Sequence, residues 1–371
     1  MLNKDLKLNP RIFDKEVEKV PIRKGFGEGL LEAAIHDKNI VGLCADLTES
    51  TQMHLFKAKF PERFIEIGVA EQNLATVASG MAAMGKIPFM TSYATFSPGR
   101  NWEQIRTTIC YNNQPVKIIG SHAGVSVGPD GGTHQMTEDI ALTRVLPRMV
   151  VISPCDAIEA KKATIALAKT KDPTYLRLAR EKTPIMTTEE TPFEIGKAQL
   201  MFRSILSGES EERRMKNEES NRNLEIGAHN LGHGQQNHIH HKAPAISKKG
   251  VGIIATGALL YNAILAAKEL DAQGVDVTVM NLATIKPLDE HAIIRLAHEY
   301  RALVTVEEHQ IAGGLGSAVA ELLAAHSPVP IEFIGMKDVF GQSGTPEELI
   351  KYYGMDVKDI VVACHKVMLR K

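Results

Sequence analysis

Short apolar runs alternate with stretches of helical periodicity along most of the chain. The strand-like runs in the first half are residues 39–46, 64–67, 86–92, 115–121, 149–154 and 174–179. Helical patterns lie between most of them, for example at 157–170. Strands and helices in alternation predict an α/β domain with a doubly wound, mostly parallel sheet over residues 21–190. Binding sites in such sheets form from the loops at the carboxyl ends of the strands.

The same alternation resumes at residue 250 and continues to 371. Its strand-like runs are residues 250–257, 275–282, 302–308 and 329–335. Residues 284–298 and 316–325 have helical patterns, and the glycines at 313–316 indicate a tight turn with close packing rather than a phosphate cradle. The chain therefore divides into two doubly wound α/β domains, each with a mostly parallel sheet.

Two segments fall outside this alternation. Residues 1–20 are polar and predict a loose N-terminal arm. Residues 191–249 form a linker that contains an insertion at 203–248, which is too polar to bury the surface that folding requires, so we expect it to be disordered. The insertion carries five histidines, His229, His233, His238, His240 and His241. These could bind a divalent metal, but no cysteine or acidic ligand closes a defined site, which favours a flexible tract.

Composition excludes several classes of function. The 371 residues have a formal net charge of −1, so no overall field favours nucleic acid or an anionic membrane. The four cysteines are scattered and form neither a CxxC pair nor a zinc spacing, which suits a reducing cytoplasm. No apolar run approaches the roughly 20 residues of a membrane span, and the N-terminus lacks a signal-peptide core. We expect a cytoplasmic protein without nucleic-acid or membrane partners.

Glu71 is the first candidate for chemistry. It follows the 64–67 run and Gly68, and precedes a helical face formed by Leu74, Val77, Ala78 and Met81. Glu71 falls on that apolar face, where little water surrounds a carboxylate. The same position also suits an ordinary first-turn glutamate that the helix dipole favours, so the pattern alone leaves both interpretations open.

A glycine-dense loop at 120–135 is the second candidate. Its backbone can approach a ligand closely because glycine has no side chain. The loop presents His122, Asp130 and His134 with little competing bulk. Imidazoles suit proton movement at substrate hydroxyls, although a single histidine is more often structural.

Several motifs together resemble transketolase. They are GVAEQN at 68–73, TSYATF at 91–96, GSHAGVSVGPDGGTHQ at 120–135, IKPLDEHAI at 285–293 and EEHQIAGGLGSAV at 307–319. They occur in the order of that family's pyrimidine-binding and C-terminal domains, and only residues 200–248 lie outside the resemblance. The resemblance implies a thiamine-diphosphate enzyme of the pentose phosphate pathway, which moves a two-carbon ketol unit between a ketose phosphate and an aldose phosphate.

The resemblance implies a cofactor-binding role for several residues. Glu71 would be the catalytic carboxylate that bonds N1′ of the aminopyrimidine. Phe96 and Trp102 match two aromatic positions of the family, and Tyr93 is also available. The family's middle aromatic falls at Gly99, which leaves open which ring stacks on the pyrimidine. Asp46 would lie near the cofactor and the dimer interface.

The sugar phosphate has its own set of implied contacts. His122 and His134 would contact the sugar and take part in catalysis, and Asp130 would recognise a hydroxyl next to the carbonyl. Arg23, Ser50 and Arg180 match the family's phosphate contacts. Arginine fits this role because its planar guanidinium binds phosphate in a bidentate way.

The family's GDG…N motif, which binds the diphosphate and its metal, is not found in this chain. By the resemblance, the chain is the C-terminal subunit of a split transketolase and holds no metal ligands itself. A separate N-terminal subunit would supply the diphosphate site, Mg²⁺ or Ca²⁺ and further histidines. Self-association through the pyrimidine domain would give an α2β2 heterotetramer.

Three alternatives stay open. The β subunit of a 2-oxo acid dehydrogenase shares the fold and Glu71 but does not need the His122, Asp130 and Arg180 set. A 1-deoxyxylulose-5-phosphate-synthase-like enzyme is closer in the glycine-dense loop, but normally has arginine at the position of His122. A non-catalytic module of the same fold would have no reason to keep Glu71 together with these side chains.

Overall fold

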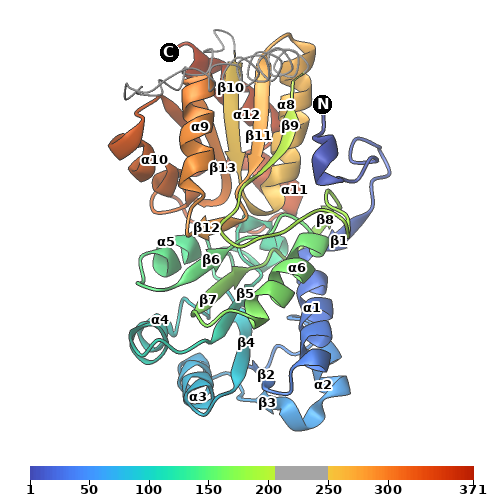
Figure 1. The fold of residues 1–371 in the computed structure, drawn as a ribbon, viewed down its shortest axis with the longest axis vertical. Helices are drawn as coiled ribbons and strands as arrows, with labels where there is room; N and C mark the ends of the chain where they lie inside the picture. The colour runs from blue at the N-terminus through green and yellow to red at the C-terminus, as the bar shows by residue number, and fades with distance from the viewer. Residues whose placement is uncertain (205–249) are drawn as a thin grey trace, which may run out of the picture.

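The computed structural model describes residues 1–204 and 250–371. Two sheets lie one beyond the other along the long axis of the molecule (Figure 1). This arrangement confirms the predicted class of two α/β domains with mostly parallel sheets. None of the described helices is both long and apolar enough to cross a membrane.

The first sheet has seven strands in the order β12-β6-β7-β5-β4-β2-β3. Their bounds are β2 Ile40–Cys44, β3 Phe64–Glu66, β4 Ile87–Tyr93, β5 Lys117–Ser121, β6 Val150–Ile152, β7 Thr174–Arg177 and β12 Thr284–Lys286. All pairs are parallel except β12 with β6. The apolar run at 64–67 suggests a buried strand, but β3 is an edge strand and its side chains are half-buried or exposed.

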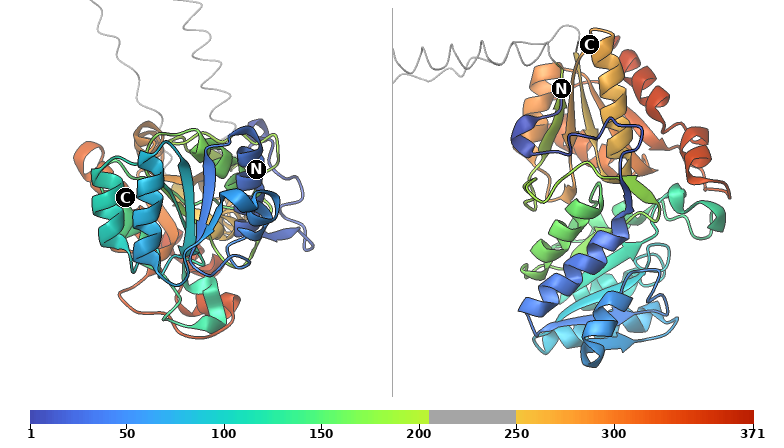
Figure 2. Two further views of the ribbon diagram at one scale, coloured as in Figure 1. Left: turned by 90° about the horizontal axis from the view of Figure 1, so that it is seen from below. Right: turned by 90° about the vertical axis from the view of Figure 1, so that its right-hand side faces the viewer.

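Helices cover both faces of this sheet (Figure 2). One face carries α1 Ile22–His36, α2 His54–Lys59 and α6 Ala157–Ala168. The other carries α3 Glu71–Ala83, α4 Trp102–Gln104, the π-helical turn η3 Ile105–Tyr111 and α5 Asp139–Arg144. Helices α1 and α6 pack closely because α1 has glycine at the crossing, where a Cβ on Gly25 would lie 1.8 Å from the carbonyl oxygen of Ala157.

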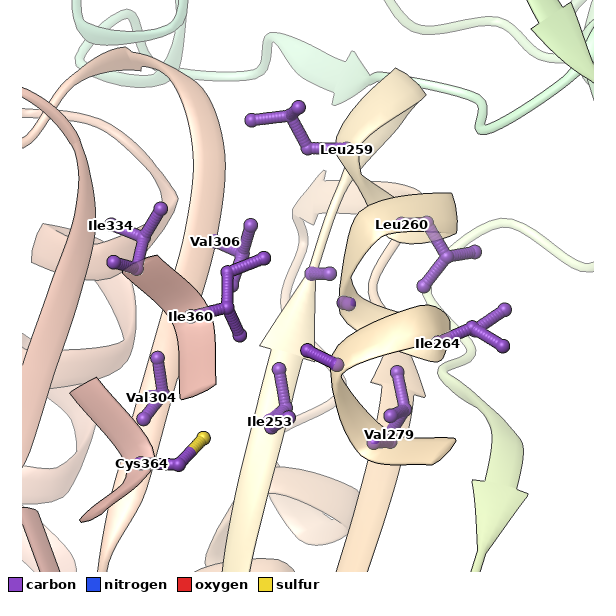
Figure 3. Packing of buried hydrophobic residues seen from close by; sticks show 14 of the residues in the cluster. Ile253, Leu259, Leu260, Ile264, Val279, Val304, Val306, Ile334, Ile360 and Cys364 are labelled. Atoms are coloured by element: carbon purple, nitrogen blue, oxygen red, sulfur yellow. The ribbon is translucent and has the colours of Figure 1, made fainter. Parts of the chain in front are cut away.

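The second sheet has five strands in the order β14-β13-β10-β11-β9. Their bounds are β9 Gln199–Arg203, β10 Gly250–Ala255, β11 Asp276–Asn281, β13 Leu303–Gln310 and β14 Ile331–Met336. Its helices are α8 Leu260–Ala272, α9 Glu290–Tyr300, α10 Leu315–His326, α11 Pro346–Tyr352 and α12 Val357–Met368. Figure 3 shows the core between this sheet and α8 and α12, where Ile253, Leu260 and Ile360 are fully buried.

The two sheets share apolar packing. One continuous cluster joins Leu74 of α3 and Leu146 of the first domain to Met280, Leu282 and Leu315 of the second. Short elements complete the fold: β1 Lys19–Pro21, β8 Lys182–Pro184, and the 3-10 turns η1 Lys4–Leu6, η2 Pro61–Arg63, η4 Val125–Asp130 and η5 Gly257–Leu259.

The prediction of a helix over 284–298 is wrong at its start. Thr284–Lys286 forms β12, which returns to the first sheet and pairs with β6. Pro287 follows the strand, and α9 begins only at Glu290, where the Asp289 side chain accepts a hydrogen bond from the amide of Ala292. A proline restricts the residue before it to extended conformations, and aspartate is a strong N-cap, so both residues favour a late start.

The prediction of a loose N-terminal arm is also wrong. The amide of Asn3 donates to Met201 O at 3.0 Å, and β1 pairs with β8. Ile12 is fully buried, and Leu2, Leu6 and Leu8 pack against the core of the second sheet. These apolar side chains hold the arm on the second domain, and Figure 1 shows the N-terminus beside that sheet.

The linker contains more order than its composition suggests. Residues 199–203 form β9, which pairs antiparallel with β11, and the amide of Ser204 donates to Val277 O at 2.9 Å. The first two residues of the predicted insertion therefore continue the second sheet. The predicted disorder and the histidine tract of the insertion lie in 205–249, outside the described residues.

Candidate active site

Glu71 is the first residue of α3 and its side chain is 1% exposed. Gly68, at φ 79°, ends β3 and turns the chain into the helix. Ser92 Oγ donates to Glu71 Oε1 at 3.3 Å, and Arg100 Nη1 donates to Oε2 at 2.6 Å. The buried carboxylate therefore faces a hydroxyl from β4 and a guanidinium from the turn after it.

Two aromatic rings and two imidazoles form a cluster near the strand ends that face Glu71. Tyr93, at the end of β4, stacks on His122 with ring centroids 3.9 Å apart, and on Phe96 at 6.1 Å. His134 meets Tyr93 and Phe96 edge-on at 6.4 Å and 5.6 Å. Four residues predicted from two separate motifs thus form one cluster at the carboxyl ends of β4 and β5.

His122 is 3% exposed and follows β5 directly. Its Nδ1 lies 2.8 Å from Ser121 Oγ. Burial first, and then the positive charges of Arg23 and Arg180 and the neighbouring His134, lower the pKa of His122 to about 3. The imidazole is therefore neutral at physiological pH, and it can donate one hydrogen bond and accept another.

Two arginines lie close enough to His122 for their charges to lower its pKa. Arg23 donates to the carbonyl oxygen of Arg180, and Arg180 in turn donates to Val127 O and lies 3.6 Å from Asp130. Burial first, and then the charge of Arg180, lower the pKa of Arg23. Two guanidinium groups held so close repel each other, and an anion bound between them would relieve that repulsion.

The other predicted residues lie outside this cluster. The indole N–H of Trp102 donates to Leu142 O at 2.7 Å, and its ring packs against the core that the two domains share. Asp46 and Ser50 lie in the loop between β2 and α2, where the Asp46 amide donates to Glu66 Oε1 at 2.7 Å. This loop is therefore positioned by the edge strand β3 rather than by the histidine-bearing loop.

The glycine-dense loop is anchored to the second domain by a buried network. Glu308 of β13 accepts from the amide of Ser126 at 2.5 Å, and the backbone carbonyl of Glu308 accepts from Arg177 Nη2 at 2.7 Å. Arg177 also pairs with Asp139 at 2.8 Å, and Tyr175 donates to the same carboxylate oxygen at 2.7 Å. The second domain thus fixes the loop that carries His122 and His134.

Glycine is required where this loop meets Glu308. Gly124 has φ 86°, and a Cβ there would lie 2.4 Å from the Glu308 carboxyl group. A larger residue would displace the loop from the second domain.

Three further site residues were not predicted from the sequence. Ser92 and Arg100 bind the Glu71 carboxylate, and Asn101 Nδ2 donates to the Glu71 backbone oxygen at 2.9 Å. The only sequence signal near them is Gly99 at the family's middle aromatic position, and it indicates a missing aromatic rather than the neighbouring arginine.

The donor set fits an aminopyrimidine. The Glu71 carboxylate already binds a planar, cationic N–H donor in Arg100, which has the same hydrogen-bonding character as a protonated ring nitrogen. Phe96 lies beside that guanidinium and offers an aromatic surface. No group of three or more His, Cys, Asp or Glu side chains suited to a metal ion occurs in residues 1–204 and 250–371.

Comparison with known proteins finds relatives that match most of the chain. The chain is 40% identical over 342 residues to a putative transketolase C-terminal section from Methanocaldococcus jannaschii, covering 91% of this chain and 93% of that protein. The chain belongs to the transketolase family. The models of the transketolase pyrimidine binding domain and the transketolase C-terminal domain match residues 18–186 and 245–360.

Two more transketolase relatives match over nearly their whole length. One is a 6-deoxy-6-sulfo-D-fructose transketolase subunit from a Clostridium species, 34% identical over 97% of this chain and 98% of that protein. The other is a solved structure described as a split gene transketolase, inactive beta4 tetramer, with a TM-score of 0.77 and 36% identity over 94% of this chain and 99% of that one. The predicted resemblance to the C-terminal section of a split transketolase is confirmed.

Proposed function

We propose that this chain is the C-terminal subunit of a thiamine-diphosphate-dependent transketolase that needs a separate N-terminal subunit. The enzyme would transfer a two-carbon ketol unit from a ketose phosphate to an aldose phosphate. The observation that carries the proposal is the buried Glu71 carboxylate at the start of α3, next to the cluster of Tyr93, Phe96, His122 and His134. The carboxylate would serve the cofactor and the cluster would serve the substrate, side by side at the start of α3 and the carboxyl ends of β4 and β5.

At the cofactor end, Glu71 would hold the proton at N1′ of the aminopyrimidine. When bound, thiamine diphosphate supplies the nucleophilic carbon and the electron sink for cleavage of a carbon–carbon bond. Phe96 is favoured as the stacking ring, because it lies beside the guanidinium that binds Glu71, at 4.5 Å. Tyr93 stacks on both Phe96 and His122 and would support Phe96. Trp102, whose indole N–H donates to Leu142 O, would shape the core beside the cofactor site. Asp46 would lie at the cofactor side near a second copy of the chain.

At the substrate end, the neutral His122 and the half-buried His134 would bond sugar hydroxyls and relay protons during catalysis. Asp130 would accept a hydrogen bond from the hydroxyl next to the carbonyl. Arg23 and Arg180, with Ser50, would bind the phosphate. The support is that the Arg23 guanidinium donates to the backbone oxygen of Arg180, and that the charge of Arg180 lowers the pKa of Arg23.

The diphosphate, with Mg²⁺ or Ca²⁺, would bind mainly to the N-terminal subunit. Some relatives of this chain are themselves single subunits of larger transketolases. One of them is a subunit of an apulose-4-phosphate transketolase from Phocaeicola vulgatus, which is 31% identical over 92% of this chain. Self-association through the pyrimidine domain would complete an α2β2 enzyme in the cytoplasm. The first substrates to test are those of the pentose phosphate pathway.

Reconstitution tests the proposal. The full chain is assayed alone and with its N-terminal subunit, thiamine diphosphate and magnesium, on xylulose 5-phosphate with ribose 5-phosphate. We expect no turnover by the chain alone and turnover by the mixture, with a Glu71→Gln mixture as the inactive control. Turnover by this chain alone would overturn the need for a partner.

Substrate class is tested in the same mixture. The donors named for its relatives, 6-deoxy-6-sulfofructose and apulose 4-phosphate, are assayed beside xylulose 5-phosphate. A mixture that binds the cofactor but cleaves none of these ketoses would contradict the transketolase proposal.

A further inference from the structure

Arg100 occupies the surroundings that the proposed function assigns to the aminopyrimidine. Its Nη1 lies 2.6 Å from Glu71 Oε2, and its guanidinium carbon lies 4.5 Å from the centroid of Phe96. One planar cation of this chain therefore binds both the carboxylate and the aromatic ring that would hold the cofactor's planar base.

The backbone turn around Arg100 is built to place it there. Asn101 is fully buried, and its Nδ2 donates to Glu71 O at 2.9 Å and to Ser97 Oγ at 3.2 Å. Gly99 allows the turn to close, because a Cβ there would lie 2.1 Å from the Thr95 carbonyl oxygen. The backbone at Arg100 is thus held in place beside the start of α3, so its side chain begins next to Glu71.

The two partners differ greatly in exposure. The Glu71 side chain is 1% exposed, whereas the Arg100 side chain is 47% exposed. A buried carboxylate oxygen without a partner is unfavourable, so Glu71 Oε2 keeps Arg100 as its donor until another donor takes its place. The exposed arginine can return to water at little cost, since its guanidinium keeps its hydration there.

We propose that Arg100 is a self-inhibitory latch, which covers Glu71 and Phe96 until the aminopyrimidine displaces it. The latch rests on the proposed function, because it deepens the role assigned to Glu71. A closed latch lowers the fraction of chains able to bind the pyrimidine, and the apparent affinity falls by the same fraction. The uncomplexed subunit is thereby kept from holding cofactor at half of a site.

The test is pyrimidine binding by the full chain, without any turnover assay. The probe is 4-amino-5-hydroxymethyl-2-methylpyrimidine, followed by ligand-observed NMR. If the latch is closed in about nine-tenths of the molecules, Arg100→Gln should bind the probe about tenfold more tightly than the unmodified chain. Arg106→Gln, an exposed arginine of the same segment, is the matched control and should bind like the unmodified chain.

Two further variants complete the design. Arg100→Met removes the charge with a different side chain and should give the same gain, which protects the test if Arg100→Gln folds poorly. The double variant Glu71→Gln with Arg100→Gln should lose the gain, because the latch acts only through the Glu71 carboxylate. Folding of each variant is checked by its thermal unfolding midpoint.

Two outcomes overturn the latch: Arg100 variants that bind the probe no more tightly than the unmodified chain, or more weakly. Weaker binding would make Arg100 a positioning residue that helps to hold the base. The transketolase proposal is judged separately by turnover in the two-subunit mixture. If Arg100→Gln binds the probe more tightly but the two-subunit mixture turns over no ketose, the latch stands and the proposed reaction is wrong. If the mixture turns over ketose but Arg100→Gln gains no affinity for the probe, the reaction stands and the latch is wrong.

Discussion

Tyr93 stacks on His122 with ring centroids 3.9 Å apart and an interplanar angle of 23°. The contact follows from the sheet, because β4 and β5 are parallel neighbours and Tyr93 is paired with Ser121, the residue before His122. A positive φ of 58° at His122 turns its side chain back over the strand end. The stacked pair is the floor of the candidate substrate site, and it accounts for the burial that lowers the pKa of His122.

Acid should destabilise the protein through His122. Its pKa is lowered to about 3 in the folded state, from an ordinary value of 6.5. Between these values the unfolded chain binds more protons, so the contribution to stability is complete above pH 6.5 and is lost as pH falls toward 3. The loss is at most about 1.4 kcal/mol per pH unit. His122→Asn should remove this part of the pH dependence.

The measurement is the free energy of unfolding in urea at pH 7.5 and pH 4.5, compared between the variant and the unmodified chain. Other buried groups contribute equally to both proteins. They include His309, whose pKa burial lowers to about 4, and Glu159 and Glu307, whose pKa burial raises to about 7. The two carboxylates act in the opposite direction and stabilise the fold as pH falls below 7. Equal pH dependence in variant and unmodified chain would contradict the neutral, buried state of His122.

His122→Ala and His134→Ala should impair sugar turnover far more than cofactor binding. Loss of a proton-transfer group typically lowers the rate by about 10²–10⁴-fold. In the two-subunit mixture we expect kcat/KM for xylulose 5-phosphate to fall within that range, while the dissociation constant for thiamine diphosphate changes little. His326→Ala, at the exposed end of α10, serves as the control. Wild-type kinetics in both site variants would show that this cluster does not bind the sugar.

Arg177→Met should destabilise the fold strongly. It removes the buried partner of Asp139 and a donor to Glu308 O, and it leaves an uncompensated carboxylate in the interface between the domains. Breaking a buried pair in this way costs about 3–5 kcal/mol. Arg11→Met breaks the exposed Arg11–Asp14 pair and should cost under about 1 kcal/mol. Urea unfolding of both variants checks the difference, and a cost for Arg177→Met no larger than for Arg11→Met would contradict the role of the network.

Residues 205–249 should be replaceable by a short linker. The residues on both sides border Asp276: Ser204 Oγ donates to its Oδ1 at 2.6 Å, and Gly250 is its neighbour in β10. Strands β9 and β10 flank β11, so the ends lie about 10 Å apart, which six Gly and Ser residues can span. We expect the thermal midpoint of the shortened chain to fall by no more than a few degrees. A large fall would show that the insertion contributes to the packed fold.

Much of the fold was predictable because strands buried on both faces of a parallel sheet have continuous apolar sequences. The runs around β2, β4, β5, β10 and β13 were recognised for that reason. The short strand β12 was not, since three residues before a helix carry no periodicity of their own. The arm was mistaken for a loose segment because Leu2, Leu6 and Ile12 are apolar anchors scattered among polar residues.

The site residues that could be predicted from the sequence are those in motifs that directly follow a strand. Glu71, His122 and His134 are brought together by the pairing of β4 and β5 and by the start of α3. Arg100 was not predictable, because its contact with Glu71 depends on how the turn at Gly99 closes. Its position is a property of the three-dimensional turn rather than of any sequence pattern.

The most direct test of the account is the Glu71→Gln variant. Glutamine has nearly the same shape, so α3 and its packing should survive, but it cannot exchange a proton with N1′. The measurement is hydrogen–deuterium exchange at C2 of thiamine diphosphate bound to the two-subunit mixture, with folding checked by thermal unfolding. The account predicts that exchange slows by at least about 10²-fold. Exchange at the unmodified rate in a folded Glu71→Gln complex would contradict it, and would leave Glu71 as an ordinary residue of the first helical turn.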